Sequence, residues 1–216
     1  MRYQNIIQLE ASGRSALFTD PLTRSGGEKC SYPVPTYEAL KGMLSSIYWL
    51  PDITWIVDSV RIMEPIRTES RSVVTRGYFK QGCDLSVYTY LTNVRYRIKA
   101  HFVPRNGQEL TPAAEHRHFR VALRMLERGG RRAVYLGTKD CPCDISPCVF
   151  SSDIGHYDNI TADLGMMFHS FSYSNGDLPS AAHYFRCRME NGIIIFPQPH
   201  ECDITQVCRE SHSALV

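Results

Sequence analysis

The sequence predicts an α+β protein: a ferredoxin-like βαββαβ N-terminal domain, of the kind found in RNA-recognition modules, followed by a smaller antiparallel β-rich extension. Two helix-periodic stretches alternate with β-rich runs over residues 1–137. Residues 138–216 instead hold short apolar runs between turn sequences such as SNGD and ENG. With 216 residues, of which 43% are hydrophobic, the chain is long enough to bury a core.

The first half of the N-terminal domain is expected to run strand, helix, strand, strand. The opening strand is predicted at 3–10, before a loop rich in Gly and Pro. Thr36 is the expected cap of a helix over 37–48. A strand is predicted at 53–63, and VYTYLTNVRYRIKAHFV, 87–103, is expected to form one or two strands of a hairpin.

The second predicted helix, 112–128, is amphipathic. Thr111 can cap its first turn, and Gly129-Gly130 allow a left-handed exit before a last strand at 131–137. On a helical wheel, one side is basic within an arc of about 80°; it holds Arg117, Arg120, Arg124 and Arg128. The opposite side is apolar and is expected to face the core; it holds Phe119, Ala122, Leu123 and Leu126.

The basic side of this helix predicts a site for a polyanion. His116, Arg117 and His118 fall in the first turn and a half, where unpaired amides and the helix dipole favour an anion. His118 lies between the basic and apolar sides, so it can also serve packing. The alternative for the arginines is a solvated face whose charges pair with acids elsewhere.

The strand predicted over 94–102 adds a second basic row. Its apolar residues alternate with Arg95, Arg97, Lys99 and His101, so one face is apolar and the other cationic. Such a row can follow a nucleic-acid backbone. The alternative is an edge strand that charge protects from aggregation.

Charge is divided unevenly along the chain. Residues 1–135 carry 20 Lys+Arg and 12 Asp+Glu, a net +8, whereas residues 136–216 carry 4 and 10, a net −6. The basic part is typical of a nucleic-acid binder, and the acidic part is free to face protein partners. The alternative is that the two parts neutralise each other. Without a leader or a long apolar run, we expect a soluble, cytoplasmic protein with reduced cysteines and no membrane association.

No metal or cofactor is expected. His116 and His118 project about 200° apart on a helix, which does not suit chelation. Cys141, Cys143 and Cys148 lack the paired spacing of most structural zinc sites. GGEK, 26–29, lacks the ending of a Walker phosphate loop.

Four segments resemble a known family. FTDPLTRSGGEKCSYPVPTYEALKGMLSSIYW (18–49), RIMEPIRTES (61–70), EHRHFRVALRMLERGGRRAVYLGTKDC (115–141) and DLGMMFHSFSY (163–173) are similar to the Cas-five "d" family of subtype I-C CRISPR systems. The resemblance implies a ferredoxin-like domain with a β extension. It also implies cleavage of CRISPR precursor RNA within the repeat without a metal, and retention of the guide RNA with the other subunits of the surveillance complex.

The resemblance also assigns residues. The family's active-site tyrosine falls on Tyr48, and its basic-residue-histidine pair falls on Arg117-His118, with His116 as a secondary candidate. The basic residue is often lysine in the family; arginine here stays charged, so it implies charge stabilisation and no proton transfer.

The RNA-binding candidates are Lys29, Arg95, Arg97, Lys99, Arg120, Arg124, Arg128, Arg131 and Arg132. The alternative functions are a non-catalytic subunit that binds the guide 5′ handle and a general duplex-DNA-binding protein.

Overall fold

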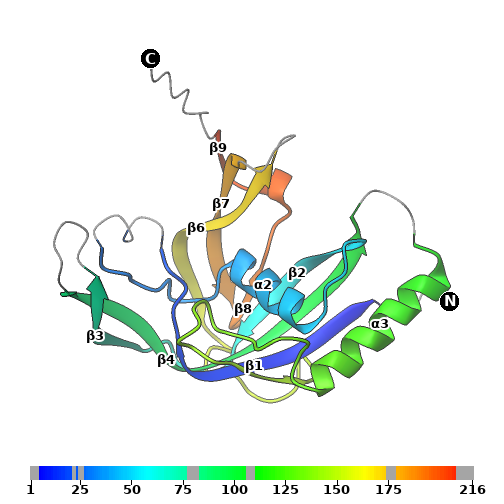
Figure 1. Cartoon of the computed structure of the whole chain (residues 1–216), viewed down its shortest axis with the longest axis horizontal. Coiled ribbons are helices and arrows are strands. Elements are labelled where there is room, and N and C mark those ends of the chain that lie inside the picture. The colour runs from blue at the N-terminus through cyan, green and yellow to red at the C-terminus, as the bar shows by residue number, and fades with distance from the viewer. Residues whose placement is uncertain are drawn as a thin grey trace.

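The computed structural model describes residues 5–20, 23, 27–76, 83–105, 110–173 and 179–207, and combines a large antiparallel sheet with two helices within them (Figure 1). The helices are α2 (Tyr37–Ile47) and α3 (Pro112–Glu127), with a short 3₁₀ turn at Pro199–Glu201. The strands are β1 (Ile6–Ala16), β2 (Ile53–Ile62), β3 (Thr68–Arg76), β4 (Cys83–Pro104), β5 (Asp144–Pro147), β6 (Thr161–Tyr173), β7 (Pro179–Glu190), β8 (Ile193–Ile195) and β9 (Ile204–Val207).

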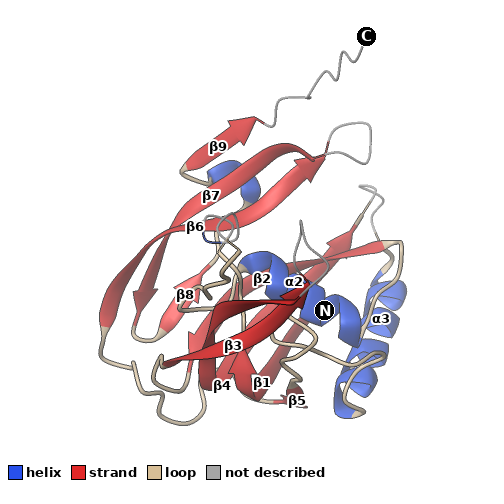
Figure 2. Cartoon of the chain, turned by 60° about the vertical axis from the view of Figure 1, so that its left-hand side comes forward, coloured by secondary structure: helices blue, strands red, loops and turns tan. Residues whose placement is uncertain are grey.

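All nine described strands belong to one sheet. Seven follow the order β5-β1-β4-β2-β8-β7-β6, while β3 pairs with β4 and β9 pairs with β7. Every paired strand runs antiparallel to its neighbour. The β2–β8 pairing joins strands from before and after residue 137 (Figure 2). The predicted division into 1–137 and 138–216 therefore lies within a continuous sheet, and two separable parts remain a prediction.

Both helices begin where their sequences predict, and each ends one residue before its predicted end. The Thr36 hydroxyl accepts a hydrogen bond from the Ala39 amide at 3.4 Å, and the Thr111 hydroxyl accepts one from the Ala114 amide at 3.3 Å. After α3, Gly129 and Gly130 have φ angles of 84° and 99°, which glycine adopts without a Cβ penalty. These local signals fix the entry of α3 and the direction in which the chain leaves it.

The strand predicted at 131–137 is wrong. This segment makes only an isolated bridge, between Tyr135 and Pro142, and the sheet edge beside β1 is formed by β5 instead. The apolar residues that suggested a strand are buried for another reason: Leu136 accepts from the Leu17 amide at 3.0 Å and donates to Cys141 at 2.8 Å. Residues 131–137 therefore lack a regular strand and pack beside the end of β1 through these hydrogen bonds.

The stretch predicted as one or two strands at 87–103 is a single long strand, β4. Its first half forms a hairpin, as predicted, but with β3, a strand that the sequence did not predict; its second half lies between β1 and β2. The hairpin projects from the body on the side away from α3 (Figure 1). Because most described side chains of β3 are exposed, its sequence TESRSVVTR lacks the alternation of a half-buried strand.

The second half of β4 has the predicted apolar row but not an open basic row. Val94, Tyr96, Ile98, Ala100 and Phe102 are all buried in the hydrophobic core. On the other face Arg97 is only 3% exposed; its Nε donates to Glu10 at 3.0 Å and its guanidinium also bonds Asp153. The expected phosphate-binding row is therefore wrong at Arg97, because residues 149–153 cover this face and acids neutralise it.

Gly137 holds the irregular segment against β1, and we expect its replacement by alanine to destabilise the fold. Its φ is +92°, and an added Cβ would lie 2.0 Å from the Leu17 carbonyl oxygen. We expect Gly137→Ala to lower the free energy of unfolding by about 2–4 kcal/mol. Urea denaturation measures this. Gly42→Ala is the matched control, since open space surrounds that helical position; equal stability of the two variants would contradict the assignment.

Candidate active site

Tyr48 stands at the point where α2 ends. Its backbone is extended, with φ −150° and ψ 128°, and its amide donates to the Leu44 carbonyl as the last contact of the helix. The buried Trp55 indole donates to the Tyr48 carbonyl at 2.7 Å. Both backbone groups of Tyr48 are therefore bonded, and the direction of its side chain is fixed.

The Tyr48 side chain meets His118, which lies 70 residues further along the chain. The hydroxyl oxygen and the His118 Nδ1 are 2.8 Å apart, a short hydrogen bond. Tyr48 is 7% exposed and His118 5%, and Phe102 packs edge-on against the imidazole. The bond fits two tautomers: the hydroxyl donates to a bare Nδ1, or a protonated Nδ1 donates to the hydroxyl oxygen. Nε2 is the ring nitrogen left for a substrate: it carries the proton in the first tautomer and can accept one in the second.

The surroundings shift the pKa values of both residues. Burial lowers the pKa of His118 below 6.5, the positive charge of Arg117 lowers it further, and Asp52 opposes both. Burial raises the pKa of Tyr48 above 10.0, Arg117 opposes this rise and Asp52 adds to it. At neutral pH the pair therefore consists of an uncharged imidazole and a protonated phenol.

The two residues beside His118 in sequence lie differently. His116 and Arg117 are exposed on α3, whereas His118 is buried. Arg117 still reaches the Tyr48–His118 pair through its charge, as the shared pKa effect indicates. His116 forms no part of that hydrogen bond. The geometry thus joins Tyr48 to His118, the charge of Arg117 acts on both, and His116 is not a partner in their hydrogen bond.

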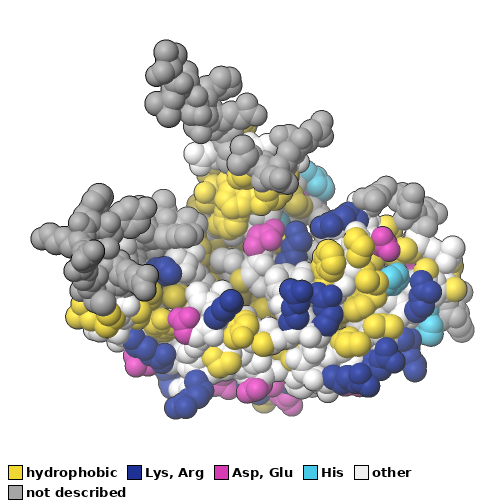
Figure 3. Space-filling view, in the orientation of Figure 1, with side chains coloured by type: hydrophobic (Ala, Val, Ile, Leu, Met, Phe, Trp, Pro, Cys, Tyr) yellow, Lys and Arg dark blue, Asp and Glu magenta, His cyan; other side chains and the backbone are white. Residues whose placement is uncertain are grey.

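The arginines of α3 form an exposed basic surface. Arg117, Arg120, Arg124 and Arg128 are all exposed, and no acid in the described part of the chain lies within ion-pairing distance of them. Figure 3 shows Lys and Arg side chains gathered along this side of the molecule. A shallow hollow of about 390 Å³ opens between Arg120 and Arg124. The predicted alternative, in which acids neutralise these arginines, does not hold for the described residues.

A family model described as CRISPR-associated protein (Cas_Cas5), of the Cas5d type, matches residues 6–197, a span that contains Tyr48, Arg117 and His118. The chain belongs to the Cas5d family. This confirms the resemblance seen in the sequence.

Individual relatives of this Cas5d protein are moderately similar. A curated protein of Mannheimia succiniciproducens, named CRISPR pre-crRNA endoribonuclease Cas5d, is 28% identical over 89% of this chain and 95% of its own length. A crystal structure titled CRISPR-associated Protein matches with TM-score 0.76 and 31% identity, covering 96% of this chain and all of the other. The functionally uncharacterized protein SMU1763c of Streptococcus mutans matches with TM-score 0.75 and 30% identity over 94% and 97% of the two chains.

Three residues that support the candidate site were not predicted. Trp55 fixes the Tyr48 backbone, Phe102 packs on His118, and the exposed Asp52 acts on the pKa of both pair members. Trp55 and Phe102 looked like ordinary core residues in alternating strands. The proline before Asp52, three residues after Tyr48, is the one sequence signal of a turn that could bring an acid back to this helix end.

The remaining RNA-binding candidates of this Cas5d protein divide into two groups. Arg131 and Arg132 are exposed, and their amides donate to the Ile47 and Ser46 carbonyls, so they lie beside the end of α2. The β4 candidates face the covered side: Arg95 pairs with Glu64 at 2.9 Å, and half-buried Lys99 shares that face with Arg97. Half-buried Lys29 lies over the Tyr88 ring, 5.0 Å from its centroid. Arg131 and Arg132 are thus the candidates that join the α3 surface.

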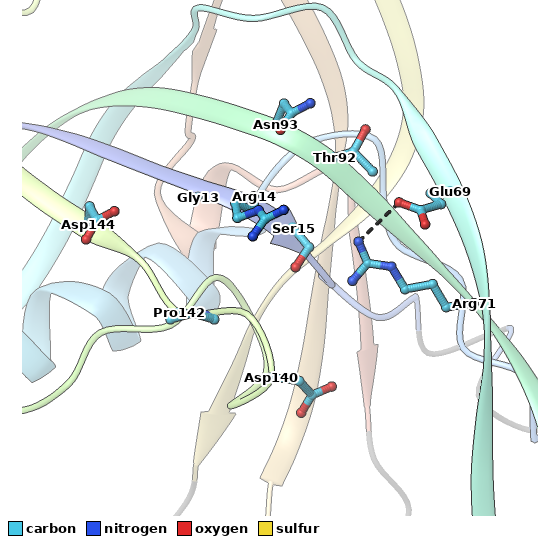
Figure 4. Close-up of a pocket in the computed structure, with 10 residues that line it drawn as sticks. All are labelled: Gly13, Arg14, Ser15, Glu69, Arg71, Thr92, Asn93, Asp140, Pro142 and Asp144. Carbon is cyan, nitrogen blue, oxygen red and sulfur yellow. Dashed lines mark hydrogen bonds and ion pairs between the residues drawn. The ribbon is translucent and has the colours of Figure 1, made fainter.

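Other features of this Cas5d protein lie apart from the pair. A surface hollow of about 660 Å³ near the end of β1 includes an Arg71–Glu69 ion pair of 3.1 Å and the Asp140 carboxylate, and no pair residue lines it (Figure 4). Cys141 is buried, and no three His, Cys, Asp or Glu residues of the described ranges lie close enough together to hold a metal ion. Nor is any helix in those ranges long and apolar enough to cross a membrane.

Proposed function

We propose that this Cas5d protein is a metal-independent endoribonuclease that cuts CRISPR precursor RNA within the repeat and remains bound to the guide in the subtype I-C surveillance complex. The observation that carries the proposal is the buried Tyr48–His118 hydrogen bond at the head of a helix with a cationic outer side. The name of the Mannheimia relative supports the same activity. The other subunits of that complex are the proposed protein partners.

The proposed scaffold for this site is a ferredoxin-like domain. Its βαββαβ succession would consist of β1, α2, β2, β4, α3 and β5. The order β5-β1-β4-β2, antiparallel throughout, supports this assignment, because each helix then connects two strands that are not neighbours in the sheet. On this scaffold, the end of α2 and the start of α3 supply the catalytic side chains.

The proposed reaction is a transesterification within the RNA. The ribose 2′-oxygen beside the scissile phosphate bonds to phosphorus while the bond from phosphorus to the 5′-oxygen breaks. His118 Nε2 accepts the proton of the 2′-hydroxyl, and the leaving 5′-oxygen takes a proton from solvent or from the phenol. The products are a 2′,3′-cyclic phosphate and a 5′-hydroxyl, so no water molecule is consumed. Such proton transfer contributes about 10²–10⁴-fold to a rate.

Tyr48 and Arg117 support the reaction in different ways. For Nε2 to accept a proton, the Nδ1–H must donate to the Tyr48 hydroxyl oxygen, and this bond then fixes both the orientation of the ring and an unprotonated Nε2 that faces the RNA. Arg117 stabilises negative charge on the phosphate oxygens, which its planar guanidinium can bind in bidentate fashion. The exposed Arg120, Arg124, Arg128, Arg131 and Arg132 bind the flanking backbone.

The test is a repeat RNA that carries a single 2′-deoxynucleotide immediately 5′ of the scissile phosphate. We expect this RNA to bind as the unmodified RNA does and to stay intact, because the attacking oxygen is missing. The same deoxy substitution at other positions should leave cleavage unchanged. Cleavage of the modified site at the normal rate would contradict a 2′-hydroxyl nucleophile.

The pKa of His118 predicts the acidic side of the pH–rate profile. Because the neutral imidazole is the proposed base and its pKa lies below 6.5, kcat/KM should rise with pH up to a value below 6.5 and then level off. In Arg117→Ala the loss of the positive charge should raise the pKa of His118 and so move this limb to higher pH. Burial of the imidazole should still hold that pKa below 6.5. Initial rates over a pH series measure the limb; a shift to lower pH would contradict the assignment.

A further inference from the structure

Trp49 is an exposed aromatic side chain directly beside the proposed catalytic tyrosine. It is 39% exposed, whereas Trp55, the other of the chain's two tryptophans, is 2% exposed. Because Tyr48 is extended, successive side chains there point to opposite sides: Tyr48 inward to His118 and Trp49 outward. A large apolar ring is therefore presented to solvent one residue from the site.

The indole is held next to a cationic side chain. The Arg131 guanidinium carbon lies 5.9 Å from the centroid of the Trp49 ring, within the range of a cation–π contact. The two residues meet because the chain after α3 is tied to the end of α2: the Arg131 amide donates to the Ile47 carbonyl at 3.1 Å. At Gly130, φ is +99°, and an added Cβ would lie 3.6 Å from the Ile47 Cα, so the two backbones approach closely.

We propose that Trp49 and Arg131 form a nucleobase subsite, in which the base of a nucleotide adjacent to the scissile phosphate stacks on the indole. Proteins recognise single-stranded RNA by stacking bases on aromatic rings and Arg guanidinium planes, while cations bind the backbone. Trp49 offers the ring, and Arg131 offers the charge beside it. The inference rests on the proposed function, since Tyr48 defines where the scissile phosphate lies.

The subsite would position the RNA and not take part in bond breaking. By stacking one base, it would fix which phosphate reaches His118, and so the position of the cut. It would accept any base, because every base has a π-face. Its loss should weaken RNA binding by about 5- to 150-fold, the range found when stacking aromatics are replaced by alanine.

The test combines Trp49 variants with repeat RNAs that cannot be cut, made with 2′-deoxyribose at the scissile position. Each RNA lacks the base of one nucleotide near that position. For the wild-type protein we expect one abasic position to weaken binding at least fivefold. Trp49→Ala should show the same loss with intact RNA and no added loss at that position, whereas Trp49→Phe should retain most of the affinity. Arg131→Gln tests the second half of the subsite in the same assay.

Fluorescence gives an independent readout, because Trp49 is the exposed member of the tryptophan pair. Intact uncut RNA should quench wild-type emission, and the RNA abasic at the sensitive position should not. Two results would overturn the subsite. In one, Trp49→Ala binds every RNA as tightly as wild type does; in the other, the loss of affinity from Trp49→Ala adds in full to the loss from the abasic nucleotide at every position tested. RNA that binds with these signatures but is never cut in its unmodified form would reject the nuclease function and retain the subsite.

Discussion

Replacing His118 by alanine is expected to reduce single-turnover cleavage of repeat RNA by about 10²–10⁴-fold while RNA affinity stays within a few-fold of wild type. The imidazole is the only proposed proton acceptor, and its Nδ1 is already bonded to Tyr48 at 2.8 Å. Removing it leaves the arginine surface, which carries the binding, unchanged. Cleavage rates at saturating protein, with affinity measured on an uncut RNA, separate the two effects.

His116→Ala is the matched control for this prediction. His116 lies two residues away on the same helix, is exposed, and is not one of the two partners of the Tyr48–His118 hydrogen bond. The His116→Ala variant should cleave at a rate within about threefold of wild type if proton transfer by His118 dominates the rate. Because His118 is buried, the unfolding transition of each variant has to be compared with wild type. A folded, RNA-binding His118→Ala protein that cuts normally would reject the assignment.

Replacing Arg117 by alanine is expected to lower the cleavage rate by about 10²-fold, the usual effect of removing one group that stabilises transition-state charge. Arg117→Lys should recover only part of the rate, because lysine restores the positive charge but not the bidentate geometry of the guanidinium. Because Arg117 is exposed, we expect neither substitution to disturb the fold, so the two variants compare the effect of charge. Single-turnover rates at one pH above the acidic limb make the comparison.

Arg124→Ala controls for the loss of a helix charge. Arg124 is exposed on the same side of α3, two turns from Arg117, and we expect it to affect RNA affinity and its salt dependence but not the rate of bound RNA. If Arg124→Ala slows bound RNA as much as Arg117→Ala does, the charge of Arg117 has no special place at the reacting phosphate.

Local chemistry made much of the helical scaffold predictable. The caps at Thr36 and Thr111 and the glycines after α3 are short-range features, and each is confirmed by a hydrogen bond or a dihedral angle. The ENG turn belongs to the same group, since Asn191 and Gly192 both have positive φ angles, as a tight hairpin between β7 and β8 requires. The SNGD turn lies outside the described residues.

Long-range pairing was less predictable. The row Arg95, Arg97, Lys99 reads as an open basic face because alternation says which residues share a side and not what covers that side. In the structure Arg97 is buried under residues 149–153, which lie more than 50 positions later in sequence. The edge strand β5 was also missed, because a four-residue segment is too short for its residue pattern to indicate which strand it pairs with.

The candidate site shows the same limit. The residue types and the family resemblance pointed to Tyr48 and His118 separately, but a contact between the end of one helix and the first turns of another depends on how both helices pack on the sheet. The burial of His118, and hence the downward shift of its pKa, also follows from that packing. Trp55 holds the Tyr48 backbone and Asp52 acts on the pKa of His118. Their roles could be recognised only after the structure showed that Tyr48 and His118 are in contact.

The most direct measurement of the central claim is the end chemistry of repeat RNA incubated with the wild-type protein in EDTA. We predict cleavage at one position, with a 2′,3′-cyclic phosphate on the upstream fragment, a 5′-hydroxyl on the downstream one, and no such products with His118→Ala. RNA that is bound but left intact would contradict the account and identify a subunit that only holds the guide 5′ handle. Equal, salt-sensitive binding of unrelated duplex DNA with no cleavage would instead identify a general DNA-binding protein.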